Sequence, residues 1–358
     1  MKNAAVLLAV LLALSAFSGD VAAVVAPDGN ALRHAINGSL PLPQDALIIK
    51  DGVLLAYHGN ETALALPDGV VAVAEAAFAG CASLTEISFP PTLTTIGDFA
   101  FYNCAALRAV SLPGSLTAIG EGCFMNCTAL EEAALPPSLV ELPSGTFYSC
   151  TSLACVDLPP GMTAIGEGAF YRCTALLAIA FPSALSSIGN GAFYRCTALA
   201  RIDLPDGLAA IGSGAFTNCS ALDSVSFPAE LIRIDEGAFA NCAALRIMDL
   251  PPSLESIGNG AFMDCTALES VLFKEGLTSI GDFAFAGCGA LLSACFPETL
   301  TTIGEGAFAD CISLAKVTLP GALTSLGSGA FYGCVNLPMP DLPSGLLHFG
   351  DEVFGGRE

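Results

Sequence analysis

A cysteine recurs at an unbroken interval of 23 residues through most of this chain, twelve times from Cys81 to Cys334. A phenylalanine stands three residues before each of these cysteines, and a leucine stands three residues after each. A unit of this length cannot bury its own apolar side, so consecutive units must stack and share one core. The interval therefore predicts a solenoid of twelve full repeats, with a partial thirteenth that begins at Phe354.

One repeat shows which local structure each position favours. Ile87 and Phe89 alternate with polar residues, which is the two-residue period of a strand with one buried side. Pro90 lacks a backbone donor and ends that strand, while Gly97 permits a tight turn. Asp98 is placed to cap a short helical turn. We therefore expect an α/β repeat with one parallel sheet on the concave face, and short strands, turns or helical turns on the convex side.

The repeat resembles a known family. The run Leu-x-x-Ile-x-Phe-Pro-x-x-Leu-x-x-Ile-Gly-x-x-Ala-Phe-x-x-Cys, as in residues 84–104, looks like the BspA-like leucine-rich repeat. The resemblance covers about residues 46–354 and implies a leucine-rich-repeat solenoid. It also implies a secreted or surface-exposed binding or adhesion protein, and it brings no catalytic motif with it.

The first residues have the pattern of a secretory leader. An apolar run at residues 4–17 follows the single basic residue Lys2, and small residues come after it. This order is typical of a cleaved signal peptide, so we assign residues 1–23 to one and expect a secreted or cell-surface protein. No second long apolar stretch follows, so the sequence predicts no membrane span.

The segment between the leader and the repeats predicts an N-terminal cap. Residues 46–50 and 53–57 form two apolar runs around an Asp-Gly turn, which is a strong hairpin signal. A solenoid needs its first apolar edge covered. We therefore assign residues 24–66 to a cap with a β-hairpin and residues 67–358 to the solenoid.

Charge and the scattered functional groups exclude several classes of protein. Twelve basic and 34 acidic residues give a formal charge of −22, which repels nucleic acid and anionic membranes. The three histidines are far apart, there is no CxxC motif, and no serine, histidine and aspartate recur together. We expect no metal, no cofactor and no enzymatic activity.

The cysteine ladder is expected to stay reduced. Equivalent residues on stacked strands lie about 4.8 Å apart, whereas disulfide-bonded Cβ atoms lie about 3.8 Å apart. The ladder cysteines then act as small apolar residues. Cys155 and Cys295 fall on outward strand positions, where each is either a tolerated small residue or a link between two molecules.

An aromatic stripe is the preferred candidate contact surface. It lies two residues before the cysteine in consecutive repeats and is flanked by two arginines. Tyrosine and arginine are enriched in binding hot spots. The alternatives are that these side chains only cover the turns, or that the small and weakly acidic concave sheet makes the contact. The candidate ligand-binding residues are Tyr102, Tyr148, Tyr171, Tyr194, Arg172 and Arg195.

Three further patterns have simpler explanations. An acidic ladder at the position of Asp98 could bind calcium, but capping of turns explains it better, because serine and asparagine also occur there. Pairs of hydroxyl residues could bind ice or a flat polysaccharide, but they are interrupted along the chain. Asn37 and Asn60 are candidate glycosylation sites, whereas asparagines before the cysteines fit turn geometry.

These observations together predict a secreted or cell-surface recognition or adhesion scaffold. Its expected ligand is a protein or a glycan, bound through the repeat surface. The alternative is a structural wall or matrix component that self-associates.

Overall fold

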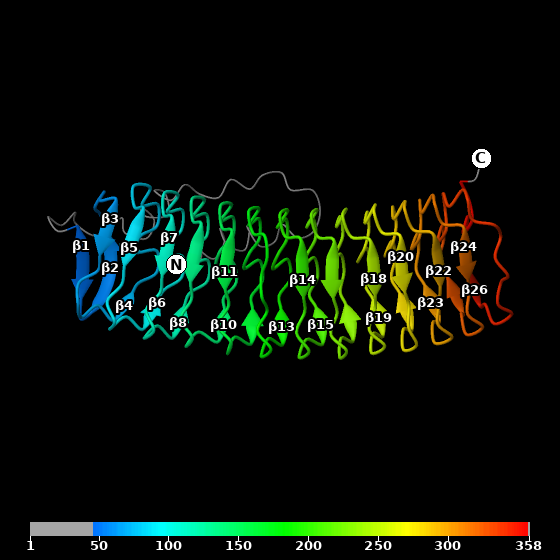
Figure 1. Ribbon diagram of the computed structural model, residues 1–358, viewed down its shortest axis with the longest axis horizontal. Helices are drawn as coiled ribbons and strands as arrows, with labels where there is room; N and C mark the ends of the chain where they lie inside the picture. Colours follow the sequence, from blue (N-terminus) through cyan, green and yellow to red (C-terminus); the bar gives the residue numbers. More distant parts are fainter. Residues whose placement is uncertain (1–45, 357–358) are drawn as a thin grey trace, which may run out of the picture. The chain divides into compact units, whose positions relative to one another are not determined.

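The computed structural model describes residues 46–356, and the chain divides into two compact units. Within the described residues, unit 1 comprises residues 46–162 and 166–175, and unit 2 comprises residues 163–165 and 176–356. Each unit is a solenoid of stacked coils, in which most repeats contribute a strand of three residues followed by a strand of two residues. Figure 1 shows the successive strands as arrows that follow the colour bar.

Unit 1 contains two five-stranded sheets, one of longer strands and one that begins with a hairpin and continues with shorter strands. The sheet of longer strands has the order β11-β9-β7-β5-β3, and the other has the order β1-β2-β4-β6-β8. The first sheet consists of β3 (Ala63–Ala65), β5 (Glu86–Ser88), β7 (Ala109–Ser111), β9 (Glu132–Ala134) and β11 (Cys155–Asp157). The second consists of β1 (Leu47–Lys50), β2 (Val53–Tyr57), β4 (Ala72–Val73), β6 (Thr95–Ile96) and β8 (Ala118–Ile119), and β10 (Glu141–Leu142) belongs to the following repeat.

Unit 2 repeats the same two rows. Its longer strands pair as β14-β16, β18-β20 and β22-β24, and seven of its shorter strands form one sheet from β15 to β26. The longer strands are β14 (Arg201–Asp203), β16 (Ser224–Ser226), β18 (Ile247–Asp249), β20 (Ser270–Leu272), β22 (Ser293–Cys295) and β24 (Lys316–Thr318). The shorter strands are β12 (Ala164–Ile165), β13 (Ser187–Ile188), β15 (Ala210–Ile211), β17 (Arg233–Ile234), β19 (Ser256–Ile257), β21 (Ser279–Ile280), β23 (Thr302–Ile303), β25 (Ser325–Leu326) and β26 (His348–Phe349).

The strands pair in parallel with a register equal to the sequence repeat. Glu132 of β9 pairs with Cys155 of β11, and Ser279 of β21 pairs with Thr302 of β23, so each pair is offset by one repeat. Equivalent residues of neighbouring repeats therefore lie side by side. The 23-residue interval fixes this register because any other offset would place polar residues in the core.

The phenylalanines three residues before the cysteines form the centre of both units. Their side chains are fully buried. Neighbouring rings are stacked, with centroids 4.8 Å apart between Phe78 and Phe101 in unit 1 and 5.3 Å apart between Phe216 and Phe239 in unit 2. Each ring covers the apolar face of the previous one. The predicted phenylalanine ladder is therefore the core.

The prediction of helical turns is wrong, and with it the α/β class: residues 46–356 contain no helix. Residues 98–103 form consecutive turns, whose backbone groups bond to the next repeat. The N–H group of Phe99 donates to the carbonyl of Glu121, and that of Phe101 donates to the carbonyl of Cys123, both at 2.8 Å. Hydrogen bonds between repeats thus replace the bonds along the chain that a helix requires.

The predicted entry hairpin is present at the start of unit 1. Strands β1 and β2 pair antiparallel, with Lys50 opposite Val53. Tyr57, at the end of β2, is fully buried and places its ring 5.2 Å from that of Phe78. The hairpin thus covers the first ring of the phenylalanine ladder. The predicted signal peptide, residues 1–23, lies outside the described residues.

Candidate functional site

The residue before each ladder cysteine has a left-handed backbone. Asn103 and Asn126 have φ angles of 57° and 61°, and glycine, aspartate or serine occupies the position in other repeats. Asparagine and glycine tolerate this conformation better than other residues. Arg172 and Arg195 adopt it as well, with φ angles of 60° and 59°. These two arginines therefore occupy positions where the backbone disfavours a long side chain.

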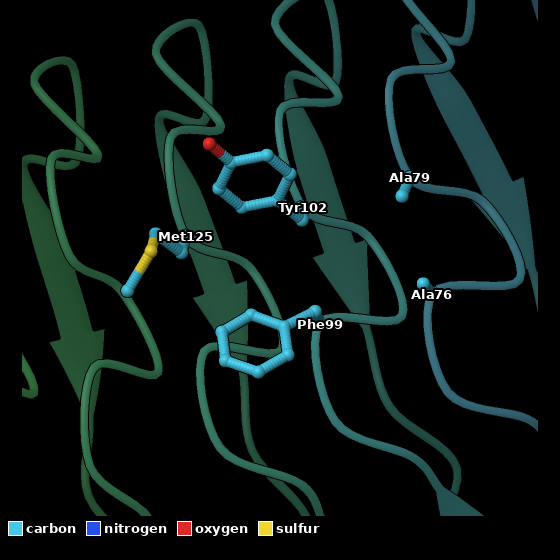
Figure 2. Packing of buried hydrophobic residues seen from close by; sticks show 5 residues of the cluster. All are labelled: Ala76, Ala79, Phe99, Tyr102 and Met125. Atoms are coloured by element: carbon cyan, nitrogen blue, oxygen red, sulfur yellow. The ribbon is translucent and has the colours of Figure 1, made fainter. Parts of the chain in front are cut away.

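The predicted tyrosine stripe is divided by burial. Tyr102 is only 5% exposed and packs with Phe99 and Met125 in a small apolar cluster, shown in Figure 2. Tyr148 lies against this cluster and is partly buried. Tyr102 therefore offers little surface to a ligand, and its main role is to cover Phe99.

Tyr148 and Tyr171 form the accessible part of the stripe in unit 1. Their rings are stacked face to face, with centroids 4.4 Å apart and an angle of 2° between the planes. Both side chains are half-buried, and Arg172 follows directly and is exposed. The pair is a stacked, partly exposed aromatic group beside a cation.

Tyr194 and Arg195 belong to unit 2. The guanidinium carbon of Arg195 lies 5.7 Å from the centre of the Tyr194 ring, within the range of a cation–π contact. Tyr194 is half-buried and Arg195 is exposed. Tyr194 and Arg195 therefore combine an aromatic ring and an arginine within a single repeat, as Tyr171 and Arg172 do.

The outward face of the longer strands is the rival surface. In unit 1 it contains a shallow depression of about 440 Å³, and the side chains that line it include Glu86, Ser111, Glu132 and Asp157. In unit 2 the corresponding face carries exposed ion pairs, such as Arg201 with Asp203 at 3.0 Å. Surface ion pairs of this kind contribute little to stability. The side chains that line the depression in unit 1 are mostly small or acidic and include no aromatic ring.

The acidic ladder joins neighbouring repeats. Asp98 Oδ1 accepts a hydrogen bond of 2.9 Å from the backbone nitrogen of Glu121. In unit 2, Asp282 Oδ1 accepts one of 2.8 Å from the backbone nitrogen of Glu305. Capping is therefore the role of this position, although it caps the next repeat and not its own. Residues 46–356 contain no cluster of three histidine, cysteine or acidic residues that could hold a metal ion.

The ladder cysteines are buried thiols, and none of the fifteen cysteines, all of which lie in the described part of the chain, forms a disulfide. Cys104 Sγ donates to the carbonyl oxygen of Phe78 at 3.2 Å, and equivalent bonds recur in both units. Burial raises the pKa of the Cys219 and Cys265 thiols to about 12. Such thiols are unreactive. The outward Cys155 and Cys295 are exposed, as predicted.

A second depression lies in unit 2, outside the residues that the sequence patterns indicate. It has a volume of about 360 Å³, and Phe283 and Tyr332 lie in its wall together with Glu305, Asp351 and Glu352. Phe283 stands five residues before its cysteine, where most repeats have glycine. An aromatic residue at a glycine position was the signal that could have identified it.

The remaining candidates are distributed as follows. Asn60 is exposed in the loop after β2, and Asn37 lies outside the described residues. Within residues 46–356, no helix has the length and apolarity needed to cross a bilayer.

Comparison with solved structures finds bacterial leucine-rich repeat proteins. One from Bacteroides ovatus is 27% identical, with a TM-score of 0.57, over 74% of this chain and 80% of that chain. A leucine-rich cell surface protein from Faecalibacterium prausnitzii is 28% identical, with a TM-score of 0.57, over 88% of this chain and 97% of that chain. A third, from Eubacterium ventriosum, is 20% identical, with a TM-score of 0.55, over 85% and 88% of the two chains. No curated protein sequence matches significantly.

Comparison with protein families gives a consistent result. The pattern described as "BspA type Leucine rich repeat region (6 copies)" matches residues 54–176, 140–265 and 233–358. These overlapping matches extend over nearly all of the described chain. Leucine-rich repeat proteins are generally non-enzymatic scaffolds, and their fold is suited to protein interaction. The chain belongs to the BspA type leucine-rich repeat family.

Proposed function

We propose that this protein is a secreted or cell-surface recognition scaffold that binds an extracellular protein or glycan through the aromatic surface of unit 1. We call this surface the Tyr148–Tyr171 surface; it comprises Tyr148, Tyr171 and Arg172. The stacked tyrosine pair is the observation that carries the proposal.

The geometry of the pair suits recognition. Two parallel rings 4.4 Å apart form one rigid and partly exposed platform. Tyrosine loses little conformational entropy on binding and combines an apolar ring with a hydroxyl group. Partly exposed tyrosines contact sugars and the side chains of protein partners through their rings and their hydroxyl groups. The surface therefore supports a protein or a glycan ligand.

Arg172 adds an energetic argument. A non-glycine residue in the left-handed region costs about 1 kcal/mol, and asparagine, which relieves part of that cost, fills the same position at Asn103 and Asn126. A residue retained against its backbone preference points to a role beyond folding. Contact between the guanidinium and a ligand is such a role.

An extracellular location is supported by two observations of different kinds. The predicted signal peptide at residues 1–23 directs a chain to secretion. The Faecalibacterium prausnitzii protein, whose solved structure is similar over 88% of this chain, is described as a cell surface protein.

The test separates binding from folding. The chain is immobilised and probed with individual extracellular proteins and surface glycans, beside the double variant Tyr148→Ala/Tyr171→Ala and the single variant Arg172→Asn. We expect a ligand whose affinity falls at least about tenfold in both variants. Arg172→Asn should at the same time raise the free energy of unfolding by less than about 1 kcal/mol, because asparagine relieves part of the cost of the left-handed backbone.

Ser149→Asn is the matched control. Ser149 occupies the same left-handed position one repeat earlier, so its change alters the backbone preference without removing a ring or a charge. It should bind the ligand as the unchanged chain does. Equal binding by all variants would place the contact elsewhere.

The self-associating wall or matrix component is the second candidate. The exposed Cys155 and Cys295 favour it, since either could link two chains. Light scattering of oxidised and reduced samples distinguishes the two functions. Oligomers that form without a foreign ligand, and dissolve on reduction or in Cys155→Ser/Cys295→Ser, would favour the structural role.

A further inference from the structure

Phenylalanine occupies a glycine position twice in this chain. The fifth residue before each ladder cysteine has a left-handed backbone, and it is glycine in nine of the twelve full repeats. Phe99 in unit 1 and Phe283 in unit 2 adopt the same conformation, with φ angles of 54° and 55°. Bulky side chains are genuine outliers there. Both rings are held against the preference of the backbone.

The two rings are placed in the same way on their repeats. A Cβ atom added to Gly122 would stand 2.3 Å from Cε1 of Phe99, and one added to Gly306 would stand 2.4 Å from Cε1 of Phe283. Each ring therefore lies directly over the glycine of the following repeat. Any other residue at these glycines would displace the ring.

The side chains that cover the two rings differ. Tyr102 and Met125 cover Phe99, with the Tyr102 ring edge-on at 6.3 Å, and leave it only 6% exposed (Figure 2). The equivalent residues in unit 2 are Ala286 and Ala309. Phe283 is consequently 44% exposed. The two missing side chains account for the depression beside it.

In both units, the repeat that follows Met125 or Ala309 has a tyrosine at the equivalent position. Tyr332 of unit 2 is equivalent to Tyr148 of unit 1, and it lines the same depression as Phe283. The wall of the depression therefore contains two aromatic rings, together with Gly306 and Ala309. In unit 1, Tyr102 and Met125 pack on the equivalent phenylalanine.

The rim of this depression is acidic. Glu305, Asp351 and Glu352 line it and are exposed, and no lysine, arginine or histidine is among the described residues that line it. Carboxylates beside aromatic faces favour a cation. A planar guanidinium can stack flat on a ring and still bond to carboxylates through the N–H groups at its edge, whereas an ammonium group has no planar face.

We propose that the depression between Phe283 and Tyr332 binds an arginine side chain of a basic polypeptide partner. The guanidinium takes the place over the Phe283 ring that Tyr102 and Met125 take over Phe99. Its charge is met by Glu305, Asp351 and Glu352. The proposal adds a second contact to the proposed recognition function, but it shares no residue with the Tyr148–Tyr171 surface, so either site can fail alone.

The test uses the full chain and fluorescent peptides of one design. A glycine-serine peptide carries three arginines, and matched peptides carry three lysines or three neutral citrullines in their place. Binding is measured by fluorescence anisotropy. Phe283→Gly removes the ring and restores the residue that other repeats use, and Ala309→Met refills the depression as Met125 does in unit 1. Glu305→Gln/Glu352→Gln removes two carboxylates from the rim.

A second pair of substitutions controls for the overall negative charge. Glu230 and Glu236 are exposed in unit 2 and do not line the depression, so Glu230→Gln/Glu236→Gln removes the same charge elsewhere. We expect the arginine peptide to bind the unchanged chain and this control alike. Its affinity should fall about tenfold or more in Phe283→Gly, Ala309→Met and Glu305→Gln/Glu352→Gln.

Three results would overturn the proposal. Equal affinity of Phe283→Gly and the unchanged chain would show that the ring takes no part. An equal loss in Glu230→Gln/Glu236→Gln would show that diffuse acidic attraction explains the binding. Equal binding of the lysine or citrulline peptide would remove the specificity for arginine.

Discussion

Phe99 and Phe283 begin from the same four-residue sequence, Asp-Phe-Ala-Phe, and end in different surroundings. In unit 1 the ring lies in a small apolar cluster, and in unit 2 the same ring lies beside an acidic depression. The backbone, the glycine beneath the ring and the core behind it are equivalent. The difference arises from Tyr102 and Met125 against Ala286 and Ala309. In a repeat protein, two substitutions at one repeated position therefore convert a closed surface into an open one.

The comparison requires that the core behind the two rings be equivalent, and this can be tested first. Phe101 and Phe285 are fully buried members of the phenylalanine ladder. Phe101→Ala and Phe285→Ala should each lower the free energy of unfolding by about 3–5 kcal/mol, because each leaves a cavity in a stacked core. Urea unfolding followed by circular dichroism measures both.

Phe89→Ser is not a suitable control, because Phe89 is partly buried and its ring contacts Phe101. Ser111→Ala, on the outward face of β7, is a better one and should change the free energy of unfolding by less than about 0.5 kcal/mol. If the free energy of unfolding of Phe101→Ala or Phe285→Ala also changed by less than about 0.5 kcal/mol, that phenylalanine would not be part of the core.

The second prediction exchanges the side chains that lie next to the Phe99 and Phe283 rings. Met125→Ala removes a buried side chain from over Phe99 and should lower the free energy of unfolding by about 2 kcal/mol. Ala309→Met adds the equivalent side chain over Phe283 and should raise the same free energy by about 1 kcal/mol, because it buries apolar area that is now exposed. Urea unfolding measures both free energies, and changes of opposite sign would support the difference between the two rings.

Ala240→Met provides the control for this exchange. Ala240 occupies the same repeat position but is already buried, and it has no phenylalanine at the glycine position beside it. It should therefore gain nothing from a methionine. If Ala309→Met destabilised the chain as well, the space beside Phe283 would not be the counterpart of the Met125 site.

The third prediction removes the two rings. Phe99→Gly loses a buried ring but relieves a strained backbone, so the free energy of unfolding should fall by about 2 kcal/mol. Phe283→Gly loses a half-exposed ring and gains the same relief, so the change should lie within about 0.5 kcal/mol of zero. Thermal unfolding of both variants measures the difference. Similar losses in the two variants would mean that burial does not distinguish the rings.

Much of this architecture could be predicted from the sequence because it depends on residues that repeat. The interval between cysteines fixes the register, and the alternation of Ile87 and Phe89 with polar residues identifies the strand. The hairpin before the repeats was predictable from its turn residues. Each of these features involves short segments with their own strong preferences.

The incorrect expectations share one physical cause. Asp98 looks like the cap of a local helical turn, but its partner is the backbone of Glu121 in the next repeat. A reading along the chain cannot distinguish a partner three residues away from one 23 residues away. Tyr102 likewise looks accessible from the sequence. It is buried against the ring of Phe99, and the position of that ring depends on an unusual left-handed backbone. The depression beside Phe283 depends on which side chains are absent from neighbouring repeats.

The last prediction concerns the titration of Tyr57, the buried tyrosine at the start of unit 1. Burial and a hydrogen bond from its hydroxyl to Glu61 raise its pKa from 10.0 to about 12. Because the folded pKa exceeds the unfolded one, this contribution to stability is complete below pH 10 and is lost as the pH rises through about 12. In a titration followed by tyrosinate absorbance in the near ultraviolet, Tyr57→Phe should remove a step near pH 12. An unchanged absorbance step near pH 12 in Tyr57→Phe would contradict the prediction.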